Sequence, residues 1–334
     1  MIDNKEILSI KKVVKELADY VMLNSVATDS TSLYYGRAGM SICLFETSRF
    51  LNDEYIEDYA FKLLQQSLLN EKNDIRFDAG LSGIGYALAY LIRNDFIDAD
   101  FFDVFHTQHN IIVDEFLRQR YDDMVLKDLV IQWQSLLYFY YIPDERLTLK
   151  AMELHDICIE KFRTEWNAMR KNTTTTDKEF IFSLWKMYLR VLPFLNQQYP
   201  CQHIREYIGL LKDGIIKRDI QPLYYISAIY LKKYDSFFST DRIEYNLSDF
   251  YLIDSLNVKD MFCLPYEFKE NVQNSIRKMF DNISIEELEK NITRQLGFSS
   301  NSAGLSFGVS GLILGLICIV TKNRHIINEI MPII

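Results

Sequence analysis

The chain has 334 residues, a formal net charge of −9 and 49% apolar residues. This composition is typical of a folded soluble domain, and the acidic net charge excludes a nucleic-acid backbone as a natural partner. The five cysteines are dispersed, so they form no disulfide framework, and residues 1–6 lack the basic and apolar regions of a signal peptide. We therefore expect a cytoplasmic protein.

Three pairs of glycines, each three residues apart, precede apolar runs in chain order. They are Gly36 and Gly39 before residues 40–44, Gly80 and Gly83 before 84–92, and Gly308 and Gly311 before 312–320. Glycine weakens a helix, so a recurring pair at a helix start indicates either an entry turn with positive φ or backbone packed too closely for a Cβ. We assign these six glycines a structural role.

The spacing of the pairs indicates an internal repeat. The second and third pairs begin 44 and 272 residues after the first, and six steps of about 45 residues reach the third pair. This period predicts further repeat starts near positions 127, 172, 217 and 263. Apolar runs typical of helices follow these positions, at residues 129–141, 180–189, 223–231 and 266–280.

Longer amphipathic segments separate the apolar runs, with apolar residues at spacings of three and four. They are residues 7–22, 55–69, 99–117, 147–162, 203–216 and 285–296. The pattern predicts an all-α fold in which tight inner helices alternate with charged outer ones. About seven such hairpins can close into an (α/α) toroid, with six-hairpin closure and an open array as alternatives. No linker divides the chain, so residues 1–334 are expected to form one domain.

Residues 303–320 form an uncharged stretch at the lower length limit for a membrane span. Their glycines repeat the paired motif found at Gly36 and Gly80, where the apolar runs are far too short to cross a bilayer. The repeat therefore predicts a buried inner helix here and no membrane span.

Candidate binding residues lie at the entries of the inner helices, because in a toroid those loops converge on one end of the ring. Arg37 is either a cation in the cavity or a residue that extends to the surface, and Asp78 is either a helix N-cap or a weak catalytic candidate. The foremost candidates are Tyr35, Arg37, Asp78, Ser82, Gln132, Trp133, Tyr225, Glu267 and Asn301, with Tyr34, Arg76, Gln134, Tyr224 and Ser302 beside them.

The segment 80–88, with Phe77 and Asp78 just before it, resembles the inner-helix signature of the lanthionine synthetase C-like proteins. Residues 36–39 and 307–315 resemble it as well. The resemblance implies a toroid of seven nested helical hairpins. It also implies that Asp78 corresponds, to within a residue or two, to an acidic residue slightly ahead of the family's second glycine motif. Enzymes of this family cyclise peptides by adding a cysteine thiol to a dehydrated serine or threonine, with zinc activating the thiol.

The chain departs from the family at the zinc ligands, which are a cysteine in one late repeat and an adjacent Cys-His pair in the next. No Cys-His dipeptide occurs here, and the late repeats offer only Cys263. One cysteine cannot supply the three protein ligands of a catalytic zinc site. The pairs Cys201 with His203 and His155 with Cys158 lie on outer helices and are interpreted as surface or packing pairs. We therefore expect no zinc and no other cofactor.

The function expected from these observations is binding rather than catalysis: a degenerate lanthionine synthetase C-like protein that binds a peptide or a peptide-modifying enzyme. One alternative is an active cyclase with an unrecognised metal site. Another is a carbohydrate-active (α/α)-barrel enzyme, for which Asp78 and Glu267 are the only nominated carboxylate pair.

Overall fold

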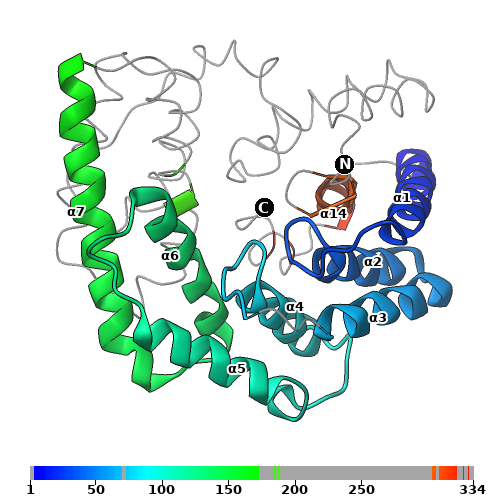
Figure 1. Cartoon of the computed structure of the whole chain (residues 1–334). Coiled ribbons are helices and arrows are strands. Elements are labelled where there is room, and N and C mark those ends of the chain that lie inside the picture. Colours follow the sequence, from blue (N-terminus) through cyan, green and yellow to red (C-terminus); the bar gives the residue numbers. More distant parts are fainter. Residues whose placement is uncertain are drawn as a thin grey trace. The chain divides into compact units, whose positions relative to one another are not determined.

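The computed structural model describes residues 4–69, 73–172, 184, 187, 188, 303–305, 308–321, 326 and 330. These residues form eight α-helices and one short 3-10 helix, and the described part contains no strand. The expected all-α class is therefore confirmed for this part of the chain (Figure 1).

The helices occur where the apolar periodicity places them. The described elements are α1 (Asn4–Ser25), α2 (Arg37–Leu51), α3 (Glu54–Leu68), α4 (Leu81–Arg93), α5 (Phe101–Arg118), α6 (Leu126–Tyr141), η1 (Glu145–Leu147), α7 (Thr148–Asn172) and α14 (Val309–Thr321). Of the helix expected over 180–189, only three residues are described, and those expected over 203–216, 223–231, 266–280 and 285–296 lie outside the described residues.

Two compact units divide the chain. The first comprises Met1–Ile112, Met261–Cys263 and Lys269–Ile334, and the second comprises Val113–Asp260 and Leu264–Phe268. In described elements, the first unit contains α1 to α4, most of α5, and α14, whereas the second contains the end of α5, α6, η1 and α7. The expectation of a single domain over residues 1–334 stays a prediction.

Burial separates the two kinds of helix in the first unit. Every residue of α2 from Ala38 to Ser48 is buried, and so is every residue of α4 from Leu81 to Leu91. The intervening helix α3 is buried only at Ile56, Ala60, Leu63, Leu64 and Ser67, the spacing of a helix that covers a core with one face. The predicted alternation of inner and outer helices is confirmed here.

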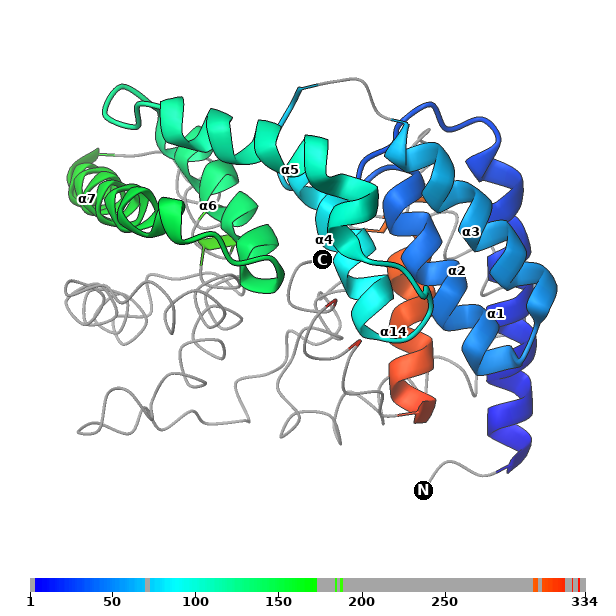
Figure 2. The same ribbon diagram turned by 90° about the horizontal axis from the view of Figure 1, so that it is seen from below.

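The last described helix packs against the first ones. Helix α14 contacts both α1 and α2, and Figures 1 and 2 show it, in orange, beside these two blue helices. Segments at opposite ends of the sequence therefore share one core. No helix in the described part of the chain combines the length and apolarity needed to cross a bilayer.

The structure decides between the two explanations for the first two glycine pairs. Gly36 and Gly80 are extended, with φ of −130° and −121°, so neither pair opens with a positive-φ turn. A Cβ on Gly39 would overlap the carbonyl oxygen of Leu33, and a Cβ on Gly83 would overlap that of Phe77. The glycines therefore permit the entry loop to lie directly on the first turn of its helix.

Candidate functional site

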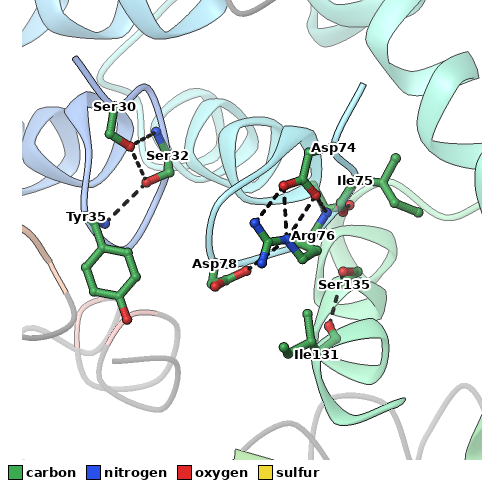
Figure 3. Close-up of polar contacts among 10 residues, drawn as sticks. Ser30, Ser32, Tyr35, Asp74, Ile75, Arg76, Asp78, Ile131 and Ser135 are labelled. Atoms are coloured by element: carbon green, nitrogen blue, oxygen red, sulfur yellow. Dashed lines mark hydrogen bonds and ion pairs between the residues drawn. The ribbon is translucent and has the colours of Figure 1, made fainter. Parts of the chain in front are cut away.

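The loops that enter α2 and α4 have the same backbone arrangement. In the first, the N–H of Arg37 donates to the carbonyl oxygen of Ser30 at 3.0 Å, and in the second the N–H of Leu81 donates to that of Asp74 at 2.7 Å. Both bonds span seven residues. Each loop therefore folds back onto its helix start in the same way. Figure 3 draws polar side chains of both loops.

A side-chain turn at the start of each loop also repeats. The Oγ of Ser30 accepts the N–H of Ser32 at 3.3 Å, and Oδ1 of Asp74 accepts the N–H of Arg76 at 3.0 Å. Serine and aspartate both support such local turns. In the second loop the guanidinium of Arg76 also forms a two-pronged ion pair with Asp74, with Nη2 to Oδ2 at 2.8 Å.

The two loops are joined by a backbone hydrogen bond from the N–H of Tyr34 to the carbonyl oxygen of Asp78, at 3.1 Å. The ring of Tyr34 packs edge-on against Phe77, with centroids 6.1 Å apart. This junction joins the two loops, and the charge of Asp78 acts on the Tyr35 side chain. We use the name entry-loop cluster for the phenolic and charged side chains of the two loops: Tyr35, Arg37, Asp74, Arg76 and Asp78.

Asp78 is an acid of the entry-loop cluster whose pKa is shifted from its ordinary value. Burial raises the pKa of its carboxyl group, against the opposing effect of the Arg76 charge and of the Ala79 N–H. Its Oδ1 is buried without a hydrogen-bond partner in the described part of the chain, and the Nε of Arg76 lies 4.0 Å away, beyond hydrogen-bonding range. Asp78 Oδ1 is thus a buried acceptor whose nearest described cation is Arg76.

The interpretation of Asp78 as a helix N-cap is wrong. Gly80 occupies the N-cap position of α4, and no side chain caps this helix end. A carboxylate two residues ahead of the cap instead lies against the loop and Arg76. The sequence alone could not fix this register, because Asp78 and Gly80 are both acceptable cap residues.

Tyr35 and Arg37 contribute a phenol and a guanidinium to the entry-loop cluster. Burial raises the pKa of Tyr35, and the charge of Asp78 raises it further, so the two groups lie within electrostatic reach of each other. The Nε of Arg37 is buried without a hydrogen-bond partner among the described residues. Each loop therefore contains one buried polar atom without a partner among the described residues, a feature that is rare in folded proteins.

Ser82 is the second residue of α4 and is fully buried. Its hydroxyl donates to the carbonyl oxygen of Ile75 at 2.6 Å. Ser310 is the second residue of α14, as Ser82 is of α4, and its hydroxyl donates to the carbonyl oxygen of Ala303 at 2.5 Å. In both repeats this serine therefore holds the entry loop against the first turn of its helix.

Gln132 and Trp133 belong to the second unit. Trp133 is fully buried, stacked on the His155 ring at 4.4 Å between centroids and on the Tyr188 ring at 5.3 Å. Gln132 Oε1 and Trp133 Nε1 are buried without hydrogen-bond partners in the part of the chain described. Cys158 is also buried, so His155 and Cys158 are packing residues, one of the two interpretations given above.

The remaining candidates cannot be placed. Tyr225, Glu267 and Asn301 lie outside the described residues, as do Cys201, His203 and Cys263. Among the residues that are described, no three histidine, cysteine, aspartate or glutamate side chains gather as a metal site would need. The expectation of a chain without zinc stays a prediction.

A polar contact that sequence reasoning missed joins the inner helices. Tyr90 of α4 donates its phenolic hydrogen to the carboxyl group of Glu46 of α2, and both side chains are buried. The two residues are one repeat apart, 44 positions. A charged residue two positions after the apolar run 40–44 was the signal that could have identified the pair.

No protein-family model matches this chain, and no match was found among curated proteins or solved structures. The resemblance to lanthionine synthetase C-like proteins therefore depends on the glycine motifs and their spacing, and the family assignment stays a prediction.

Proposed function

We propose that this chain is a divergent lanthionine synthetase C-like toroid of helical hairpins, without a zinc site, that binds a peptide or a peptide-modifying enzyme through the entry-loop cluster. The supporting observation is the cluster itself. Two adjacent repeats each contain a buried polar atom without a hydrogen-bond partner in the described part of the chain, the acceptor Asp78 Oδ1 and the donor Arg37 Nε. A peptide unit offers the complementary N–H and carbonyl groups.

Closure into a ring is supported by the match between two repeat junctions. A Cβ on Gly83 would lie 2.8 Å from Cβ of Leu33, and a Cβ on Gly39 would lie 2.8 Å from Cβ of Leu305. Leu33 and Leu305 each lie three residues before the first glycine of a pair. The last glycine motif thus contacts the first as the first contacts the second, which is the arrangement a closed array of repeats produces.

Binding is tested by fluorescence anisotropy with a fluorescein-labelled peptide that contains cysteine and dehydroalanine. We expect Arg37→Ala and Asp78→Ala each to weaken binding by about ten-fold or more, equivalent to about 1.4 kcal/mol. Asp78→Asn, which keeps an acceptor oxygen, should retain more affinity than Asp78→Ala. The matched controls are Arg118→Ala and Asp19→Asn, which alter exposed charges on outer helices.

The same peptide separates binding from catalysis. After incubation with the protein, alkylation and mass spectrometry should show the thiol unreacted, and elemental analysis should find less than stoichiometric zinc. One zinc per chain together with thiol loss above the uncatalysed rate would establish a cyclase instead. Binding that survives both alanine substitutions would exclude the entry-loop cluster as the binding site.

A further inference from the structure

The carboxy-terminal part of the first unit is attached to the first repeat at three levels. The N–H of Leu305 donates to the carbonyl oxygen of Tyr34 at 2.8 Å. Burial raises the pKa of the Cys43 thiol to about 12, and the nearby hydroxyl of Ser310 in α14 opposes this shift. Helix α14 then packs along α1 and α2, as both views show (Figures 1 and 2). Backbone, side-chain and helix contacts all join the same two segments.

The surface that receives this segment is a repeat surface. On the second repeat, Leu33 fills the space above Gly83, and on the first repeat Leu305 fills the space above Gly39. The first repeat therefore offers a binding surface shaped for a glycine-motif helix of this chain. The described residues 303–305 and 308–321 occupy it.

We infer that residues 303–305 and 308–321 act as a clasp, whose docking on the first repeat determines the order of the loop 30–37. The carbonyl of Tyr34 is bonded to the clasp and its N–H is bonded to Asp78, so this residue is held from both sides. Tyr35 and Arg37 follow directly. Release of the clasp removes one of the two attachments and loosens the side chains that the proposed function uses.

A disulfide that locks the clasp tests this inference in the full chain. In Ser310→Cys, the new thiol replaces a hydroxyl that acts on the buried Cys43 thiol, so a thiol oxidant applied at raised pH, where more thiolate forms, should join the two sulfurs within one molecule. Hydrogen exchange read by mass spectrometry should then slow at least about ten-fold over residues 30–37 compared with the reduced protein. The reduced and oxidised forms of one variant are each other's control.

The opposite perturbation is Leu305→Ala, which removes a fully buried side chain from the clasp. We expect exchange to accelerate over 30–37 and 309–321 together. Leu64→Ala is the matched control, because it removes an equal side chain from the core of the same unit at α3. Leu64→Ala should not accelerate hydrogen exchange over residues 30–37 and 309–321 together.

Three results would overturn the clasp. They are a disulfide that forms only between two molecules, exchange over residues 30–37 that is unchanged by locking, and equal effects of Leu305→Ala and Leu64→Ala. None of these measurements uses a ligand. Loss of peptide binding in the locked protein, or its absence throughout, would therefore be recognised separately as a failure of the proposed function.

Discussion

The loops before α2 and α4 share a backbone but differ in their side chains. Both contain the seven-residue hydrogen bond, the local side-chain turn and a glycine pressed against a carbonyl. The first loop presents serines and tyrosines, whereas the second presents an Asp-Arg-Asp series. The comparison teaches that repeat geometry depends on a few small residues and backbone groups, which leaves the other positions free for chemistry.

The largest expected effect comes from the glycines, where the two loops are alike. Gly83→Val and Gly39→Val should each lower the free energy of unfolding by about 3 kcal/mol or more, because the added side chain overlaps a backbone carbonyl that cannot move alone. Urea denaturation measures both. Tolerance of valine at one of the two positions would show that the loops are not equivalent.

Ser82 marks a difference between the loops that should have an intermediate effect. Ser82→Ala leaves the buried carbonyl of Ile75 without this donor and should cost about 1–2 kcal/mol. The first loop has Ala38 in the equivalent position, where its N–H reaches the carbonyl of Thr31 at 3.4 Å. Ala38→Ser should therefore cost less than Ser82→Ala in parallel denaturation experiments. The reverse order would contradict the assigned register.

Asp78 should have a smaller, pH-dependent effect on stability. Its pKa in the folded protein is raised above the ordinary 3.8, mainly by burial. The folded protein therefore binds this proton more tightly than the unfolded chain does. Its stability falls as pH rises from the pKa of Asp78 in the unfolded chain to the higher pKa in the folded protein. Asp78→Asn removes this dependence.

Thermal and urea denaturation should give the same free energy of unfolding for Asp78→Asn and the wild type near pH 3. At pH 7 the variant should be more stable by a few tenths of a kcal/mol, because solvent screens a partly exposed carboxylate. A variant that is more stable but binds the labelled peptide less well would identify Asp78 as a residue kept for function. A variant less stable at pH 7 would show that the carboxylate stabilises the loop.

The smallest effect on stability is expected when one loop receives the turn-forming residue of the other. Ser30 is exposed, and an aspartate there can accept the N–H of Ser32 as Asp74 accepts that of Arg76. Ser30→Asp should change the free energy of unfolding by less than about 0.5 kcal/mol. A cost above about 1 kcal/mol would mean that the local turn depends on the pairing of Ser30 with Ser32.

The sequence was sufficient to predict the apolar helices that begin near Gly36, Gly80 and position 127, because glycine spacing and apolar periodicity are local signals. It could not choose between a positive-φ turn and close packing, since that depends on a carbonyl brought close by folding. It also left His155 as either a surface or a packing residue. The ring that stacks on His155 belongs to Trp133, a partner that helical periodicity does not specify.

The candidate site was predictable only in part. Tyr35, Arg37 and Asp78 were named from their positions at helix entries, and their loops do lie together in the first unit. Asp74 was not named, although its spacing from Arg76 and Asp78 is typical of a charged turn. Its ion pair with Arg76 depends on side-chain geometry that spacing alone does not determine.

The contact between α14 and α2 has a consequence for synthesis of the protein. Helix α2 leaves the ribosome early, but the helix that covers part of it follows roughly 250 residues later, which at about 5–20 residues per second is a delay of about 12–50 s. During that time an apolar face of the nascent chain stays uncovered. Such a chain folds through contacts of very high sequence separation, so slow folding and chaperone binding before chain release are expected.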